Sequence, residues 1–430
     1  MTEITPRAVI TGMGIVTPLG DSPATVHAAL CTGLSAIGPW RSIDVSAADL
    51  KIGGDLGAYD PLPRLEALKP RLSAPAARSL RRMLHTLPWS MRLGLLPALT
   101  AWLDAGLDSA PPADPARVAV IAAGHTINSQ YINRTGLTFE TAPGQIDALY
   151  ALHSLDCIHA AAVGELIAAR GAVYSLGSAC ASGLHALRAG LMEIAGGQAD
   201  VVVVHAPAAE LSAVELHSMA LMQTVSLSGD GRPQQASRPF DRQRDGFVPA
   251  HGTATVVLES PAHAHARGAR IHAGVLAVAA TSDGCHLPLP NAGGEARAMA
   301  MALSVSGLTA GDIDMVSAHA TSTPAGDAAE ITALRQVLGA RLDRIPINAA
   351  KSMLGHCLWA APLVELVVAI EQMRTGLLHP TLNLTDPDPE FAGLNLCAGA
   401  PQRQTVRALL KNSFGFGGTN AACILAHPDA

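Results

Sequence analysis

A chain of 430 residues that is 49% hydrophobic and 15% charged can bury an extensive core, either as one large α/β unit or as two or three smaller domains. Its formal net charge of −6 argues against a general nucleic-acid-binding protein. Seven scattered cysteines show no disulfide spacing, and no apolar run or leader points to a membrane or to secretion, so we expect a cytoplasmic protein.

Predicted strands alternate with predicted helices along the whole chain. Many of the strands are continuous apolar runs, as expected when helices cover both faces of a sheet. The predicted strands span 8–11, 118–122, 201–205, 253–258, 315–318, 345–348, 408–411 and 422–426. Helical patterns include 184–194 and 362–373, and 261–268 has the composition of a link between two halves. This pattern by itself predicts a large α/β protein.

Cys180 is predicted to lie at a turn between a strand and a helix. A β-prone run at 172–176 gives way to small residues at 177–183 and then to the helical pattern. Unpaired N–H groups and the dipole at a helix N-terminus lower the pKa of a thiol and favour a nucleophile. The alternative is a structural cysteine, because free cysteines are usually buried.

Two later turns each carry one histidine after an apolar run, His319 and His356. A cysteine with two histidines suits acyl transfer, because a thiolate can carry an acyl group and imidazoles can polarise a carbonyl. Taken singly, each histidine is more often a hydrogen-bonded structural residue. A metal site is disfavoured, because no CxxC or HxxxH pair stands at ligand spacing.

These turns belong to six motifs that follow one another in a family-specific order. The motifs lie at 7–20, 179–183, 237–248, 316–327, 348–365 and 412–420. On them, the chain resembles the β-ketoacyl-[acyl-carrier-protein] synthases of the thiolase superfamily, in the elongating branch. The resemblance runs almost from end to end of the chain.

The resemblance implies an α/β, thiolase-like fold. Two similar halves, residues 1–262 and 263–430, would pack as a five-layered α-β-α-β-α sandwich. The first half would carry the nucleophilic cysteine. The second would carry both histidines and a glycine-rich gating loop.

The resemblance also implies a decarboxylative Claisen condensation. An acyl group would pass from the phosphopantetheine of an acyl carrier protein to Cys180, and malonyl-acyl carrier protein would then condense with it to give 3-oxoacyl-acyl carrier protein. His319 and His356 would hydrogen-bond the malonyl thioester carbonyl. The N–H groups of Cys180 and Phe416 would form an oxyanion hole. No metal and no organic cofactor are expected.

Supporting residues follow from the same motifs. Lys351 and Glu365 would pair beneath the site, with Lys351 orienting His356; the alternative is a solvent-facing lysine. Asp327 and Glu330 would support the His319 loop or an ordered water.

Two loops would gate the cysteine. Phe416, flanked by Gly415, Gly417 and Gly418, would form the first gate, and a loop with Asp283 and His286 the second. Without the resemblance, these segments would be an ordinary turn and a surface loop.

Partners can be predicted from charge. Carrier proteins are acidic, so a basic helix with Arg78, Arg81 and Arg82 is a candidate docking face. A merely solvated helix is the alternative. The family implies a homodimer, or a heterodimer with a chain-length-factor-like subunit.

Several departures from the family pattern predict a specialised member, in polyketide or unusual fatty-acid synthesis. His251 stands where a carboxylate is usual, Trp359 and Pro362 replace small residues, Ala320 replaces a glycine, and 149–160 is unusual. Trp359, Met219 and Met222 are candidates for the substrate pocket, and a core-filling role for Trp359 is the alternative.

Two other functions remain open. The first is an enzyme that only decarboxylates malonyl groups, transfers acyl groups or hydrolyses them. The second is a silent chain-length subunit, which usually lacks the cysteine, so that Cys180 argues against it.

Overall fold

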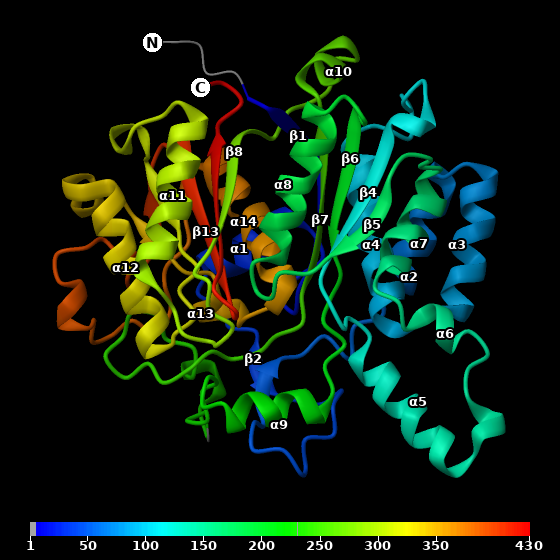
Figure 1. Ribbon diagram of the computed structural model, residues 1–430, viewed down its shortest axis with the longest axis horizontal. Coiled ribbons are helices and arrows are strands. Elements are labelled where there is room, and N and C mark those ends of the chain that lie inside the picture. Colours follow the sequence, from blue (N-terminus) through cyan, green and yellow to red (C-terminus); the bar gives the residue numbers. More distant parts are fainter. Residues whose placement is uncertain (1–5, 230) are drawn as a thin grey trace.

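The computed structural model describes residues 6–229 and 231–430. Within them, ten strands form one sheet in the order β10-β9-β13-β14-β8-β1-β7-β6-β4-β5 (Figure 1). The strands are β1 (Ala8–Val16), β4 (Val118–Ala123), β5 (Val173–Leu176), β6 (Val201–Ala206), β7 (Thr253–Glu259), β8 (Ala273–Ser282), β9 (Met315–Ser317), β10 (Ile347–Asn348), β13 (Ala408–Gly415) and β14 (Thr419–Ala426). All eight predicted strands overlap with these.

The sheet consists of two halves with the same topology. In β1-β7-β6-β4-β5, two antiparallel pairings are followed by two parallel ones. The same order of pairings recurs in β8-β14-β13-β9-β10. A short antiparallel register between β1 and β8 joins the halves. The chain passes from one half to the other through α10 (Pro261–Ala266), and the boundary at 262/263 stays a prediction.

Helices complete five layers. In the middle, α8 (Ser182–Ala195) and α14 (Ala361–Thr375) pack against each other and against strands of both halves. On the outside, α4 (Trp89–Asp104) and α7 (Cys157–Ile167) cover the first half. The second half is covered by α11 (Ala292–Ser306), with α12 (Pro324–Leu338) packed on it (Figure 1). The predicted five-layered arrangement is confirmed.

The central position of α14 explains its composition. Its residues are buried from Ala361 to Met373, so most of its side chains are apolar on every side of the helix, and Glu365, Glu371 and Gln372 are buried among them.

Shorter elements surround these layers. The helices are α1 (Pro23–Cys31), α2 (Leu62–Leu68), α3 (Ala74–Thr86), α5 (Ser129–Thr141), α6 (Tyr150–His153), α9 (Ala213–Leu221) and α13 (Lys351–Leu354), and the strands are β2 (Ile37–Pro39), β3 (Ile52–Gly54), β11 (Leu377–Leu378) and β12 (Gln402–Arg403). No helix in the described part of the chain is long and apolar enough to cross a membrane.

The first strand continues to Val16, beyond the predicted end at residue 11, because the prediction stopped at its glycines. A Cβ on Gly12 would lie 2.1 Å from the carbonyl oxygen of Ala101, and one on Gly14 would lie 2.0 Å from that of Pro97. Glycines that punctuate a sequence are usually turn signals. Here they let α4 lie directly on β1.

Candidate active site

Cys180 lies in the predicted turn between β5 and α8. The preceding residue, Ala179, has a positive φ of 46°. The hydroxyl of Ser182 accepts a hydrogen bond from the N–H of Ser178 and donates one to the carbonyl of Ala179, each at 2.7 Å. The turn therefore holds Cys180 at the start of α8, where it is 9% exposed.

The thiol of Cys180 is protonated at neutral pH. Burial raises its pKa to about 11, while the charge of Lys351 and hydrogen bonds from the N–H groups of Cys180 and Phe416 lower it. The backbone N–H groups thus lower this pKa in the predicted direction, but burial outweighs them in the free protein. The thiol needs a base before it can attack.

His319 follows β9 on a loop tied down by two carboxylates. Glu330 accepts hydrogen bonds from the N–H groups of His319 at 2.8 Å and Ala320 at 2.7 Å. Asp327 accepts one from the N–H of Ser322 at 3.1 Å. The φ angles of Ala320 and Ser322 are 30° and 69°, in the region that favours glycine. Glu330 and Asp327 thus support a strained loop.

His356 comes from a second loop and faces the first histidine. Its N–H donates to the carbonyl of Val248 at 2.7 Å. The ring centroids of His319 and His356 are 5.5 Å apart. Burial, reinforced by the charge of Lys351, lowers the pKa of both imidazoles well below the usual value. Both are therefore neutral at neutral pH.

Lys351 orients His319 rather than His356. Its Nζ lies 2.5 Å from Oε1 of Glu365, donates to the carbonyl of His319 at 2.6 Å and approaches Nδ1 of His319 at 3.4 Å. The predicted link to His356 is corrected here, because these contacts are made with the other histidine. An ammonium can only donate, so Nδ1 of His319 accepts and Nε2 carries the proton.

The two predicted gating loops touch each other. A Cβ on Gly415 would lie 3.1 Å from the nitrogen of Cys180, and Gly417 and Gly418 have φ angles of 79° and 64°. The N–H of Asp283 donates to the carbonyl of Gly418 at 2.9 Å. The glycines thus allow the loop to pass close to the cysteine.

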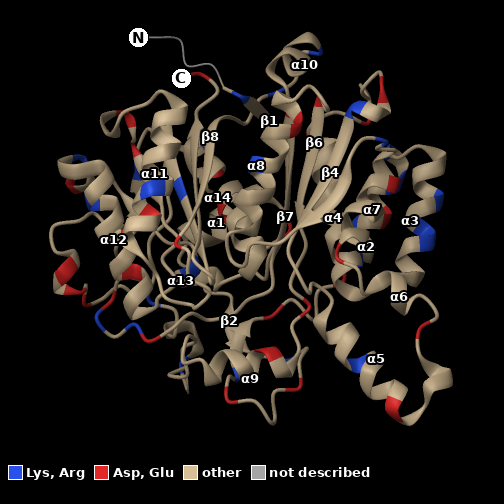
Figure 2. Ribbon diagram, in the orientation of Figure 1, with Lys and Arg blue, Asp and Glu red and all other residues tan. Residues whose placement is uncertain are grey.

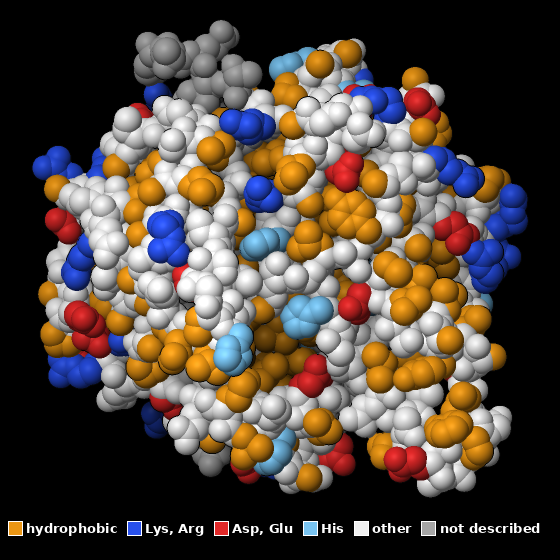
Figure 3. Space-filling model, viewed as in Figure 1, with side chains coloured by type: hydrophobic (Ala, Val, Ile, Leu, Met, Phe, Trp, Pro, Cys, Tyr) orange, Lys and Arg blue, Asp and Glu red, His pale blue; other side chains and the backbone are white. Residues whose placement is uncertain are grey.

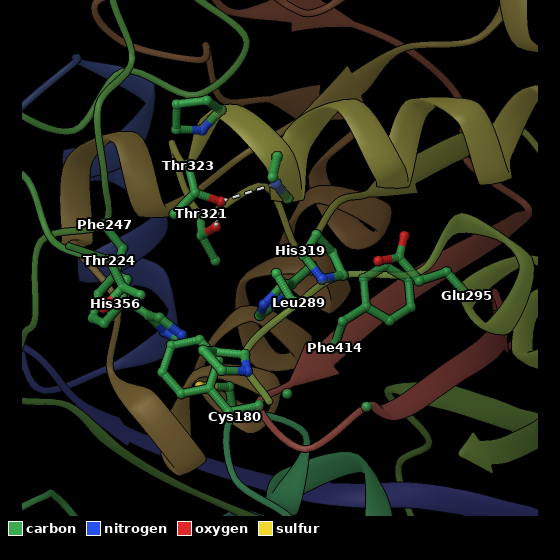
Figure 4. Close-up of a pocket in the computed structure, with 18 of the residues that line it drawn as sticks. Cys180, Thr224, Phe247, Leu289, Glu295, His319, Thr321, Thr323, His356 and Phe414 are labelled. Carbon is green, nitrogen blue, oxygen red and sulfur yellow. Dashed lines mark hydrogen bonds between the residues drawn. The ribbon is translucent and has the colours of Figure 1, made fainter. Parts of the chain in front are cut away.

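A cavity of about 330 Å³ connects these groups. Cys180, His319, His356, Phe416 and Asp283 all line it. Figure 4 shows the cysteine and both histidines around one space. Figure 3 shows a hollow lined by hydrophobic side chains, with histidines at its rim, near the ends of β13 and β14.

Comparison with known proteins agrees with this site. The model of the β-ketoacyl synthase N-terminal domain matches residues 5–264, and that of the C-terminal domain matches 272–385. A 3-oxoacyl-[acyl-carrier-protein] synthase 2 from Rhizobium meliloti is 33% identical, over 97% of this chain and 98% of the relative. One from Mycobacterium bovis is 34% identical, over 97% and 96%.

The chain belongs to the β-ketoacyl synthase family.

Solved structures support the same family. A β-ketoacyl synthase from Burkholderia phymatum has a TM-score of 0.84 and 31% identity, over 98% of this chain and 100% of that one. A chain from a type II PKS acyl-carrier protein in complex with its ketosynthase bound to a hexaketide has a TM-score of 0.85 and 26% identity, over 98% and 100%. The thiolase-like fold is therefore confirmed for this β-ketoacyl synthase.

The three residues predicted for the substrate pocket, and His286 of the second gating loop, do not line the cavity. His286 is exposed on its loop, and Met222 is 44% exposed. Met219 packs against the core, as does Trp359, whose Nε1 donates to the carbonyl of Pro207 at 3.0 Å. The predicted pocket roles of Met219, Met222 and Trp359 are therefore corrected, and the core-filling alternative holds for Trp359.

The unusual His251 also lies outside the cavity. Its ring packs against Trp40 and Trp89, with centroid distances of 5.0 and 4.9 Å, and its Nδ1 accepts the N–H of Leu56 at 3.1 Å. It fills an aromatic pocket between β3 and α4.

The three arginines of the candidate docking helix are exposed on α3, which Figure 2 shows as basic at the edge of the molecule. Arg82 forms an ion pair with Glu165 of α7. Arg78 and Arg81 make no ion pair with the residues that the structure describes.

Glu295 is a cavity residue that sequence reasoning missed. It is 1% exposed, its Oε2 has no hydrogen-bond partner among the described residues, and burial raises its pKa to about 10. It is therefore a neutral acid in the wall of the site. A lone carboxyl in the otherwise apolar pattern of α11 was the only signal.

Lys411 and a set of polar wall residues were also missed. Lys411 is fully buried on β13, within 2.7 Å of Glu365. Its signal was a lysine inside an apolar strand. The wall residues are Gln223, Thr224, Thr321 and Thr323.

Proposed function

We propose that this protein catalyses the decarboxylative condensation of an acyl group, held on Cys180, with malonyl-acyl carrier protein to give 3-oxoacyl-acyl carrier protein. One observation carries this proposal: a thiol and two neutral imidazoles share one cavity, with two backbone N–H groups close to the sulfur. Each group is needed in one of two steps.

In the first step, an acyl group moves from a carrier thioester to Cys180. A neutral imidazole takes the thiol proton as the sulfur attacks the carbonyl carbon. The N–H groups of Cys180 and Phe416 stabilise the oxyanion. The bond to the carrier sulfur then breaks, and the carrier thiol leaves with a proton.

In the second step, malonyl-carrier protein loses carbon dioxide. The electrons of the broken C–C bond form an enolate, whose oxygen accepts hydrogen bonds from Nε2–H of His319 and from His356. The enolate carbon bonds to the acyl carbon, and the C–S bond to Cys180 breaks. The released thiolate takes up a proton. Because the protein's own groups serve every step, we propose no metal or organic cofactor beyond the carrier's phosphopantetheine.

We also propose that the carrier docks on Arg78 and Arg81 of α3, since both are exposed and basic. In the cavity, Thr321 and Thr323 would offer hydroxyls to the amides of the carrier's arm. Alanine at both arginines should raise the KM for carrier substrates and leave kcat unchanged, whereas an unchanged KM would place docking elsewhere.

A dimer is proposed from the exposed edge of the sheet. β5 ends the sheet and pairs only with β4 among the described strands. Val173 is 37% exposed there, and Leu149, Leu152 and Leu155 of the unusual segment are exposed nearby in the chain. One solved relative is named as a ketosynthase/chain length factor, so a partner could be a second copy or a related subunit.

We also propose the kind of pathway in which this condensation takes place. The relatives include synthases named for 3-oxoacyl-carrier products and a type II PKS ketosynthase. We therefore propose polyketide or specialised fatty-acid synthesis.

The alternatives lose their support in the structure. Trp359 and His251, which depart from the family pattern, lie outside the cavity and do not obstruct it. Cys180, His319 and His356 all line the cavity, and a catalytically silent subunit has no need for this set of residues.

The proposal is tested by incubating the protein with a panel of acyl-carrier proteins and malonyl-carrier protein. Intact-protein mass spectrometry should show an acylated enzyme and a carrier product extended by one ketide unit, both absent with Cys180→Ala. Carbon dioxide release or acylation without extension would contradict the condensation.

A further inference from the structure

Two buried lysines share one carboxylate beneath the active site. Nζ of Lys351 lies 2.5 Å from Oε1 of Glu365, and Nζ of Lys411 lies 2.7 Å from Oε2. The lysines are 1% and 0% exposed, and Glu365 is 3% exposed. The pair Lys351–Glu365 would be neutral by itself, so Lys411 brings an additional buried charge that the reaction steps do not use.

The surroundings of Lys411 fit an ammonium. Besides Glu365, its Nζ donates to the carbonyl of Asn412 and to the hydroxyl of Ser413 at 3.4 Å. The ion pair with Glu365 and these two hydrogen bonds surround the ammonium with oxygen atoms, which suits a group that can only donate. Burial lowers the pKa of Lys411, and the charge of Glu365 opposes this change. The cluster of Lys351, Glu365 and Lys411 therefore carries one excess positive charge.

The excess charge acts on both histidines. Lys351 connects the cluster to His319, because its Nζ contacts the carbonyl oxygen and Nδ1 of that histidine. Burial is the largest cause of the low pKa of His319 and of His356; the charge of Lys351 lowers both further, and that of Lys411 adds a smaller effect in the same direction.

Other titratable groups face the cluster from the elements around it. Glu330 on α12 raises the pKa of Lys411, and Cys423 on β14 is buried against it. The charges of Lys351 and Glu365 shift the pKa of Cys180 and of Cys357 in opposite directions. The charge of Glu365 also raises the pKa of His379. Of these groups, Glu330 is engaged by the N–H groups of the His319 loop and by Asn412, at 3.0 Å.

We propose that Lys411 is a positioning residue: it takes one oxygen of Glu365, fixes that carboxylate under Lys351, and places a positive charge behind the contact between Lys351 and His319. This inference rests on the proposed function, in which a neutral imidazole accepts the thiol proton of Cys180. A protonated imidazole cannot do so, and imidazolium at His319 would also lose its contact with the Lys351 ammonium.

Replacing Lys411 by methionine should leave stability unchanged or raise it, while activity should fall only on the acid side of the pH profile. Lys411→Met removes the excess charge and leaves Lys351 paired with Glu365. Replacing part of a buried ionic cluster by an apolar side chain that leaves no unpaired charge is often neutral or stabilising. A structural lysine would instead destabilise the fold when replaced.

The test is the pH dependence of acylation of Cys180 by an acyl-carrier protein, measured in the wild type and in Lys411→Met. The acid limb should move up by about one pH unit in the variant, because losing a nearby positive charge raises the imidazole pKa values. The plateau at high pH should be retained, and the melting temperature should not fall. Lys69→Met, which removes a surface charge next to Glu66, is the control and should leave the limb in place.

An unchanged acid limb in Lys411→Met would overturn the inference. Lys411→Gln, which keeps a hydrogen-bond donor without the charge, is the second variant, and loss of folding in both would show a structural role instead. NMR titration of His319 and His356 in the free protein gives a readout independent of catalysis. If the wild type accepts no acyl group, the proposed function fails, while these titrations still decide the role of Lys411.

Discussion

At the scale of single residues, burial governs the chemistry of this site. Cys180, His319, His356 and Glu295 all have pKa values shifted toward the neutral form, with burial as the largest cause. The charged groups are collected in the cluster around Glu365 instead. The resting site therefore holds its reactive groups uncharged, directly above a fixed positive charge.

The reactivity of Cys180 should follow its raised pKa. Since the thiol has a pKa of about 11, its alkylation by iodoacetamide in the free protein should keep rising with pH beyond pH 9. Peptide mapping by mass spectrometry separates Cys180 from the other six cysteines. A rate that levels off below pH 8 would show a thiolate at rest and contradict this account.

Glu365 should matter more for stability than either lysine. Glu365→Gln leaves two buried ammonium groups without a countercharge, which should cost about 3–5 kcal/mol of unfolding free energy. Urea denaturation measures this loss, with Lys411→Met as the matched variant that leaves a neutral pair. If both substitutions lowered the unfolding free energy by the same amount, the cluster would not carry the excess positive charge that we infer.

Sequence reasoning located reactive residues better than their surroundings. Cys180, His319 and His356 stand where apolar runs end, so their turns could be predicted from local pattern. Lys411 and Glu295 could not, because a polar residue in an apolar strand or helix does not reveal its partner. The pKa of Cys180 was misjudged for the same reason: burial depends on the whole fold.

At the scale of elements, close backbone contacts set the layers. The outer helix α4 rests on β1 without intervening side chains at Gly12 and Gly14. The duplicated order of strands could be inferred only through the resemblance, because apolar runs do not specify which strands pair. Glycine has no side chain, so Gly12 and Gly14 permit this contact but give the sequence no apolar pattern from which the full length of β1 could be predicted.

Gly14→Ala should therefore destabilise the protein by about 2 kcal/mol or more, since its Cβ would overlap the carbonyl of Pro97. Gly38→Ala in β2 is the control, because nothing lies within 4 Å of its added Cβ, and it should change stability by less than about 0.5 kcal/mol. Both values can be measured by chemical denaturation. A harmless Gly14→Ala would mean that α4 can move away from the sheet.

At the scale of the whole molecule, the edge strand β5, with its exposed Val173, indicates a partner. Light scattering should find a dimer at micromolar concentration, and Val173→Lys on β5 should weaken it, because a charged side chain blocks edge-to-edge pairing. A monomeric wild type that still condenses would contradict this interface. A monomer that gains activity with a second subunit would favour a heterodimer.

The coupling of decarboxylation to carbon–carbon bond formation tests the central claim most directly. In a single turnover, acylated enzyme receives malonyl-carrier protein labelled in its free carboxyl group, and labelled carbon dioxide and 3-oxoacyl-carrier protein are both quantified. The account predicts one molecule of each per acyl-enzyme consumed. Carbon dioxide without the condensed product, or loss of the acyl group as free acid, would contradict it.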